Sequence, residues 1–145
     1  MYKHILIPTD GSDLSNKAIR DGIALAKTIN AKVTGITVTT PFHIFATDPD
    51  TITDTADSYT KRTRAAATKY LTQVKDAAAT AGVTCAVIHA EDEHPHSAII
   101  DAANKNGCDL IAMASHGRRG ISAVVLGSET VKVLTHSNIP VLVYR

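Results

Sequence analysis

The residues of this chain best placed to do chemistry follow the apolar run LIAMA at 110–114. Three glycines interrupt the chain there: Gly117, Gly120 and Gly127. Glycine reaches backbone conformations in which successive N–H groups can point inward at an anion. A new amphipathic run opens at Ser128, where the free N–H groups and the dipole of a helix would favour a phosphate. The donors would be Ser128, Glu129 and Thr130. The segment predicts a phosphate site, and a plain turn followed by a helix cap is the alternative.

A second turn, PTDGS, follows the first apolar run HILIP at 4–8. In open α/β sheets ligands bind beyond the carboxyl ends of the strands, where the winding direction reverses. If the two turns share that place, Asp10 can hold ribose hydroxyls or a divalent metal, and Val38, at the end of the second strand, can pack on a base. A capping or turn role for Asp10 is the alternative.

Hydrophobic periodicity along the chain alternates strand and helix, which predicts how these turns are positioned. The expected strands cover 4–8, 32–40, 83–90, 109–114 and 140–144. The expected helices cover 13–29, 57–81, a stretch that ends at Gly107, and 128–136. Short apolar strands joined by helices predict an α/β fold, a doubly wound open parallel five-stranded sheet of order 3-2-1-4-5 with helices on both faces. We expect one domain over 1–145, with 41–57 as a candidate lid or binding loop.

Composition excludes several function classes. The chain has 145 residues, 44% of them hydrophobic and 20% charged, and a net charge of +1. Such a balance does not indicate a surface for nucleic acid, which normally carries a clear basic excess. No apolar run approaches the roughly 20 residues that cross a bilayer. The N-terminus places a proline and an acid too soon after its apolar residues for a secretory signal, so we expect a cytoplasmic protein without membrane contact.

Other candidate groups are expected to be structural. The chain lacks a P-loop motif and a G-x-G-x-x-G after the first strand. The acidic stretch EDEHPH at 91–96 is interpreted as a solvated loop that precedes a helix, and not as a metal site. Cys85 and Cys108 are expected as buried thiols, too far apart in this sheet for a disulfide. His116 has no partner at a spacing that indicates catalysis, so no catalytic residue is assigned.

The chain resembles the universal stress protein family over nearly its full length. The resemblance is carried by ILIPTDGSDLSNKA at 5–18, GCDLIAMASHGRRG at 107–120 and LGSETVKVLTHSNIPVLVYR at 126–145. Members that bind ATP show G-x2-G-x9-G-[ST]. Here Gly117 and Gly127-Ser128 match this motif, and Ala114 replaces its first glycine. The added methyl is expected to weaken nucleotide binding modestly.

The resemblance implies ATP or another adenylate as ligand, with Mg²⁺ or Mn²⁺ as a possible companion. Pro8, Thr9 and Asp10 would form the first nucleotide-contacting turn, and Val38 and Met113 would flank the adenine. Residues 114–120 and 127–130 would wrap the ribose and phosphates. Arg118 and Arg119 would add charge near the phosphates, or form a solvated surface pair.

The last apolar run, IPVLVYR, is expected as an edge strand. Val141 and Val143 would invite pairing with another chain, and a two-fold homodimer is the simplest closed solution. Universal stress proteins often dimerise through their last strand. We therefore expect a dimeric, nucleotide-binding stress sensor or regulator with an unidentified protein partner. The alternatives are a dimeric scaffold that binds no nucleotide, and a slow ATPase.

Overall fold

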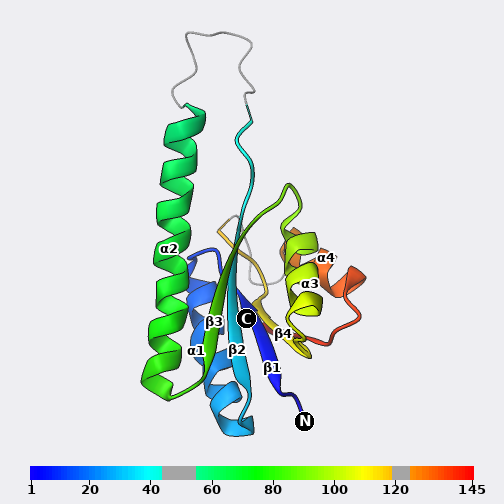
Figure 1. Ribbon diagram of the computed structural model, residues 1–145. Helices are drawn as coiled ribbons and strands as arrows, with labels where there is room; N and C mark the ends of the chain where they lie inside the picture. The colour runs from blue at the N-terminus through cyan, green and yellow to red at the C-terminus, as the bar shows by residue number, and fades with distance from the viewer. Residues whose placement is uncertain (44–54, 119–124) are drawn as a thin grey trace.

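The computed structural model, which describes residues 1–43, 55–118 and 125–145, contains a five-stranded parallel sheet (Figure 1). The strand order is β3-β2-β1-β4-β5, so the predicted doubly wound topology is confirmed. The strands are β1 (His4–Pro8), β2 (Lys32–Thr39), β3 (Cys85–Glu91), β4 (Leu110–Ala114) and β5 (Val141–Tyr144). Because β1 lies between β2 and β4, the winding reverses there, and the turns after β1 and β4 leave the same edge of the sheet.

Four helices cover the two faces of the sheet. They are α1 (Asp13–Ile29), α2 (Ala56–Ala81), α3 (Pro95–Lys105) and α4 (Ser128–His136). Figure 1 shows α1 and α2 on one side of the sheet and α3 and α4 on the other. The predicted boundaries are confirmed to within a few residues. Of the predicted loop at 41–57, residues 44–54 lie outside the described part of the chain.

The ends of the helices follow from local side-chain chemistry. Ser12 caps α1, because its Oγ accepts the N–H of Ser15 at 3.2 Å. Gly82 ends α2 in the left-handed region at φ 71°, where glycine carries no steric penalty. The start of α4 differs from a helix cap by the Ser128 side chain, which is one form of the alternative to a phosphate site. Gly127 is the N-cap, so Ser128 is the first helical residue and does not act as a cap.

Each face of the sheet has its own apolar core. The core on one face contains residues of α1, α2 and the strands, for example Ile23 of α1, Val74 of α2, Ile5 of β1 and Val33 of β2. The core on the other face contains residues of α3, α4 and the strands: Ile99 of α3, Val133 of α4, Leu6 of β1, Ile36 of β2 and Met113 of β4. Full burial of one such side chain contributes about 1.5–3 kcal/mol. Because successive side chains of a strand point to opposite faces, adjacent strand residues such as Ile5 and Leu6 lie in different cores. This alternation fixes the face on which each site residue lies.

The two cysteines occupy strands that are not neighbours. Cys85 begins β3 and Cys108 precedes β4, and three strand steps separate β3 from β4 in the sheet order. Both are free thiols. Cys108 is buried as expected, and burial raises the pKa of its thiol to about 11, whereas Cys85 is only partly buried. The absence of a bridge agrees with the predicted layout.

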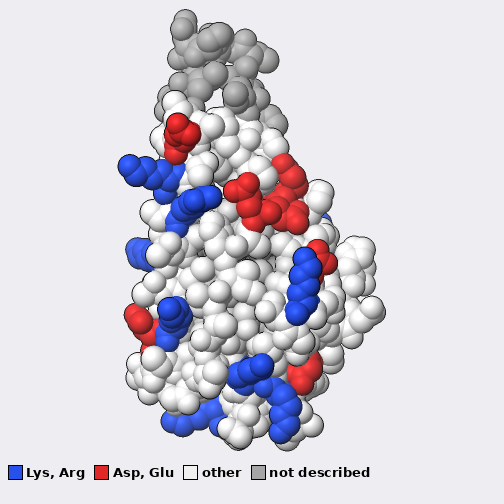
Figure 2. Space-filling model, viewed as in Figure 1, with Lys and Arg blue, Asp and Glu red and all other residues white. Residues whose placement is uncertain are grey.

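Charge on the face seen in Figure 2 is mixed. Basic residues are spread along α2 and the lower edge, and acidic residues gather near the connection between β3 and α3, where Glu91 and Glu93 are exposed. No single sign of charge dominates this face, in keeping with the net charge of +1. None of the helices in residues 1–43, 55–118 and 125–145 combines the length and apolar character needed to span a membrane.

Candidate functional site

Asp10 joins the two turns that sequence analysis singled out. Its Oδ1 accepts the N–H of Ser12 at 3.0 Å within the β1 turn. Its Oδ2 accepts the N–H of Arg118 at 3.0 Å, from the turn after β4 and 108 positions along the chain. A Cβ at Gly117 would overlap Asp10 Oδ2, so the second turn approaches the carboxylate closely only because residue 117 has no side chain. The two turns therefore form the walls of one site.

The Asp10 carboxylate is held in its ionised form. Burial on its own would raise the pKa of this carboxyl. Hydrogen bonds from Ser12, Arg118 and Ser15 favour the charged form more strongly, so the pKa of Asp10 lies below its usual value. At neutral pH the site thus contains a fixed negative charge that can accept hydrogen bonds from hydroxyl groups or attract a cation.

Thr9 is buried and ties the β1 turn to its neighbours. Its N–H donates to Ile36 O at 2.9 Å, and its carbonyl accepts the Thr37 hydroxyl at 2.9 Å. Its hydroxyl lies 3.1 Å from Ser15 Oγ and accepts the N–H of Gly11 at 3.2 Å. Because all these groups are engaged within the protein, the structure gives Thr9 a positioning role in the turn.

The N-terminus of α4 presents unpaired donors. Gly127 donates its N–H to Ser115 O at 2.7 Å, and Thr130 Oγ1 donates to the carbonyl of Ala114 at 3.0 Å. These two bonds fix the helix start against the end of β4. No side chain caps the helix, and the backbone N–H groups in its first turn have no acceptor among the described residues. These donors belong to Ser128, Glu129 and Thr130. They form a ready anion-binding end.

Gly127 is also closely enclosed, in this case by backbone atoms. A Cβ at position 127 would lie 2.9 Å from His116 Cα and 3.3 Å from Ser115 O. Backbone atoms cannot yield as a flexible side chain can, so the turn after β4 folds against the helix start only because residue 127 is glycine. The motif glycines thus bring three backbone segments together: the β1 turn, the β4 turn and the start of α4.

Apolar residues from three neighbouring strands lie on the face that α3 and α4 cover. Met113 of β4 belongs to the core on that face, and Val38 of β2 packs against it. Pro8 ends β1 between them, two positions after Leu6 of the same core, and is half-buried. Pro8 and Val38 can therefore offer apolar surface to a flat ring, whereas Met113 is only 6% exposed and supports them from within the core. Ala114 is buried and only 8% exposed, so most of its methyl group contacts the protein.

Arg118 reaches Asp10 through its backbone and not through its guanidinium. The guanidinium donates from Nη2 to the hydroxyl of Tyr70, and its carbon lies 5.1 Å from the centre of that ring. Tyr70 belongs to α2, on the opposite face of the sheet from α4. The structure therefore places the charge of Arg118 away from the α4 N-terminus. The other predicted residues of this turn, Arg119 and Gly120, lie outside the described residues.

One site residue, Tyr70, gave no signal in the sequence, and the contacts of another, Ser115, could not be read from it. Tyr70 covers the β1 turn so closely that a Cβ at Gly11 would overlap its ring. Ser115 anchors both β5 and α4, because it donates its N–H to Tyr144 O at 2.8 Å and accepts from Gly127. A tyrosine in an Ala-rich helix that also contains Tyr59 gives no signal of this contact. Ser115 lies inside the glycine motif, and that position was the signal available.

The Glu129 side chain turns away from the donors on its own backbone. Its Oε2 accepts the N–H of His96 on α3 at 2.9 Å, and its Oε1 accepts from Lys132 Nζ at 3.2 Å. Burial alone would raise the pKa of Glu129. The bonds from Lys132 and His96 and the charge of Lys132 outweigh burial and hold that pKa below its usual value. The Glu129 carboxylate thus fastens α4 to α3, while its N–H remains available at the site.

Comparison with known proteins agrees with this fold. The model of the universal stress protein family matches residues 1–145. Universal stress protein MJ0531 of Methanocaldococcus jannaschii is 33% identical over all of this chain and 83% of its own length. Universal stress protein YxiE of Bacillus subtilis is 30% identical over the full length of both. The chain belongs to the universal stress protein family.

Solved structures of similar proteins include nucleotide complexes. A universal stress protein in complex with cAMP is 25% identical, with a TM-score of 0.71 over 99% of this chain and 97% of that one. A universal stress protein from Archaeoglobus fulgidus in complex with dAMP is 18% identical, with a TM-score of 0.70 over 99% and 98%. At that identity the second structure supports the shared fold alone.

Proposed function

We propose that this chain binds an adenine nucleotide where the β1 turn, the β4 turn and the N-terminus of α4 meet, and acts as a dimeric regulator in a stress response. The observation that carries the proposal is the 3.0 Å hydrogen bond between Asp10 Oδ2 and the N–H of Arg118, which closes two distant turns into one site. The cAMP complex of a similar protein supports the same ligand class.

The groups at this site suit the three parts of an adenylate. The phosphates would bind the free N–H groups at the start of α4, where the helix dipole adds to the attraction. The Asp10 carboxylate would accept hydrogen bonds from ribose hydroxyls. Val38 would pack against the base, supported by Met113 on the same sheet face. A divalent ion that accompanies the phosphates would neutralise part of their charge, with Asp10 as the protein group suited to it.

Binding, and not rapid catalysis, is the role that these groups support. Phosphoryl transfer requires charge stabilisation and a positioned nucleophile at the reacting phosphate. In the described part of the site, Asp10 accepts two backbone N–H groups and would use its remaining lone pairs for the ribose or an ion, while the Arg118 guanidinium donates to Tyr70, so neither is assigned to activating a nucleophile or stabilising charge at the reacting phosphate. We therefore assign no catalytic residue. If the test below detects slow ATP hydrolysis, that activity would be added to the proposed binding function.

The dimer would form through β5. This strand is the edge of the sheet beyond β4. Apart from Met1 and Tyr2, the exposed large apolar side chains of the described residues all lie on α4, on β5 or just before α4. They are Val125, Val131, Leu134 and Leu142. Edge pairing of two β5 strands, which the predicted residues Val141 and Val143 help to form, would cover this surface.

Ala114 favours a second candidate function, a dimeric scaffold whose nucleotide site stays empty. It replaces a glycine of the family's ATP-binding motif at the end of β4. Because its methyl group is largely buried, we expect Ala114 to weaken nucleotide binding modestly and not to abolish it. The variant Ala114→Gly should therefore tighten ATP binding.

The test is direct. Purified protein is heat-denatured and the supernatant is analysed for released nucleotide. Nucleotide-free protein is then titrated with ATP, with and without Mg²⁺, by calorimetry, and phosphate release is followed in the same samples. Saturable binding at one site per chain supports the proposal. If no nucleotide is released and none binds, the scaffold function stands instead. Turnover that vanishes in Asp10→Ala but persists in the surface variant His89→Gln would add slow ATP hydrolysis.

A further inference from the structure

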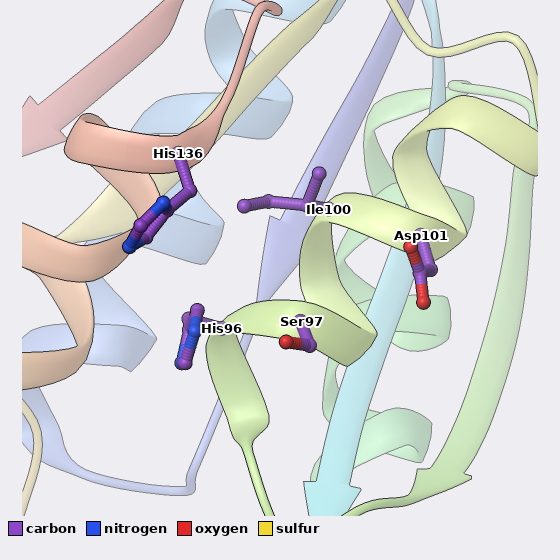
Figure 3. Close-up of a pocket in the computed structure, with 5 residues that line it drawn as sticks. All are labelled: His96, Ser97, Ile100, Asp101 and His136. Atoms are coloured by element: carbon purple, nitrogen blue, oxygen red, sulfur yellow. The ribbon is translucent and has the colours of Figure 1, made fainter.

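A pocket lies between α3 and α4, outside the proposed nucleotide site. It has a volume of about 300 Å³ and is lined by His96, Ser97, Ile100, Asp101 and His136. Figure 3 shows the imidazoles of His96 and His136 on the same side of the pocket, projecting toward each other from α3 and α4, with Asp101 on the other side. The nucleotide proposal makes no use of these side chains.

Two imidazoles line this pocket and a third, that of His94, lies beside them, at ring separations that suit a shared metal ion. The ring centres of His96 and His136 lie 5.7 Å apart, and those of His94 and His96 lie 6.0 Å apart. A metal–nitrogen bond of about 2.0–2.1 Å places each ring centre about 3.2 Å from the ion. Two imidazoles on one ion therefore have centres about 5 to 6.4 Å apart, from a tetrahedral to a linear arrangement. Both observed separations fall in this range.

Apart from the 3.3 Å contact between His96 Nδ1 and Glu129 Oε2, the ring nitrogens of these residues have no protein partner among the described residues. Within the described residues, the rings of His94 and His136 make no hydrogen bond. The Nδ1 of His96 is buried and also makes none. Unpaired buried polar atoms are uncommon in folded proteins and require an explanation. Pairing of this Nδ1 with the nearby Glu129 carboxylate supplies one, and it would leave Nε2 of His96 free to bind a metal ion.

Glu129 is placed to orient the His96 ring. Its Oε2, already fixed by the N–H of His96 at 2.9 Å, lies 3.3 Å from Nδ1, outside hydrogen-bond geometry. A small ring rotation would turn this contact into an Nδ1–H donation to the carboxylate. The lone pair would then be on Nε2. Histidines that ligate metals commonly donate their other ring N–H to a carboxylate in this way.

We propose that His96 and His136 bind a late divalent transition metal such as Zn²⁺ or Cu²⁺, with His94 as the third ligand. Imidazole nitrogens favour these ions over Mg²⁺, which prefers oxygen ligands. As the side chains stand, no three potential ligands among the described residues are close enough to hold an ion. His94 is exposed, so its side chain can turn toward the pocket at little cost in packing. Solvent would complete the coordination.

The fold creates this site, because the stretch EDEHPH lacks ligand spacing by itself. His94 and His96 flank Pro95 at the start of α3, whereas His136 comes from the last turn of α4, 40 positions later. The packing of α3 against α4, held by the bond from His96 to Glu129, brings His136 to the pair. Taken alone, the local cluster at 91–96 predicts only a solvated loop, because His136 is absent from it.

The test uses tag-free, EDTA-treated and nucleotide-free protein, so its result does not depend on the proposed nucleotide site. Calorimetric titration with ZnCl₂ should show one ion per chain. His96→Gln and His136→Gln should each lower the affinity at least tenfold, because loss even of an orienting partner commonly costs about 10- to 100-fold. The matched control His89→Gln changes an exposed histidine on β3 and should leave the affinity unchanged. MgCl₂ should give no binding at this site.

Two spectroscopic readouts distinguish ligation from a purely structural effect. Electron paramagnetic resonance of the Cu²⁺ complex should show at least two imidazole nitrogens in wild type and fewer in His136→Gln. Long-range ¹⁵N NMR of metal-free protein should show the Nδ1–H tautomer of His96, and Glu129→Gln should reduce that preference together with the affinity. The proposal is overturned by absent saturable Zn²⁺ binding, by an equal loss in His89→Gln, or by a copper spectrum without nitrogen ligands.

Discussion

Gly117 leaves open the space that the Asp10 carboxylate occupies. A methyl group at position 117 would overlap Asp10 Oδ2, and the N–H of the next residue, Arg118, donates to that same oxygen at 3.0 Å. The glycine of the family motif therefore has a specific physical task here, apart from any direct contact with a nucleotide. It lets a turn from the second half of the sheet close on a carboxylate from the first strand.

The variant Gly117→Ala tests this task. The added methyl should displace the Asp10 carboxylate and break its bond to Arg118, and hydrogen bonds to charged groups contribute about 1.5–3 kcal/mol. We expect ATP affinity, measured by calorimetry, to fall at least tenfold. The matched control is Gly35→Ala in β2, whose Cβ would lie 2.8 Å from Val74 Cγ1 in the core on the α2 side. It should lower the free energy of unfolding by about 1–3 kcal/mol and leave the ATP affinity of the folded protein unchanged. Equal ATP affinity in wild type and Gly117→Ala would contradict the assigned role.

The charge of Asp10 should also stabilise the fold in a pH-dependent way. Its folded-state pKa lies below the unfolded value of about 3.9, so the stabilisation is complete above that value and is lost as pH falls through the folded-state pKa. Asp10→Asn should lower the free energy of urea unfolding by about 1–2 kcal/mol at pH 7. The difference from wild type should shrink below about pH 4. A difference that stays constant down to pH 2.5 would mean that the carboxylate charge is not responsible.

Because His4 is buried, we expect the free energy of unfolding to show a second pH dependence, at higher pH than that of Asp10. His4 is 6% exposed, and its Nε2 lies 2.7 Å from Thr34 Oγ1. Burial, aided by the charge of Lys32, lowers the pKa of His4 below 6.5. The unfolded chain therefore binds a proton first as pH falls. The stabilisation is complete above about pH 6.5 and declines below it, by at most about 1.4 kcal/mol per pH unit.

His4→Gln is the matching variant, because glutamine can keep the bond to Thr34 without titrating. Chemical denaturation between pH 7.5 and 5 should show a flatter dependence of unfolding free energy on pH in His4→Gln than in wild type. The surface variant His89→Gln should follow the wild-type curve. An unchanged slope in His4→Gln would assign the pH dependence to other groups.

The periodic parts of the sequence were sufficient to predict the fold. The strand HILIP and the helix that Ser12 caps were predicted at their observed bounds, because apolar spacing and capping chemistry are local signals. The strand order followed from the rules for right-handed crossovers. The expected first residue of β3 was two positions early, at Val83. That residue packs in the core on the α2 side without joining the strand, so apolar character alone misplaced the boundary.

The contacts of the candidate site were harder to predict. Motif spacing pointed to Asp10 and Gly117, but not to their direct contact across 107 positions. Likewise, no local pattern shows that the Arg118 guanidinium packs on Tyr70 or that His96 bonds to Glu129. Such contacts depend on how helices pack across a sheet. That packing is set by side chains far apart in the sequence.

Dimerisation through β5 can be tested by charge. Leu142 is 36% exposed on the edge strand, and Leu142→Lys would place a charge in each half of a two-fold interface. Sedimentation velocity should show a dimer for wild type and a monomer for this variant or for a chain truncated after Ile139. The control Tyr2→Lys changes an exposed apolar residue that precedes β1 and should remain dimeric. A dimer that persists after truncation would place the interface elsewhere.

The most direct test of the central claim is an NMR titration of ¹⁵N-labelled, nucleotide-free protein with ATP. We predict that the amide signals of Gly11, Arg118 and Ser128 shift together and saturate with a single dissociation constant, because three backbone segments form one site. Signals near Ala79, in the last turn of α2, should not move. Shifts confined to one of the three segments, or saturable binding that leaves all three unchanged, would contradict the account.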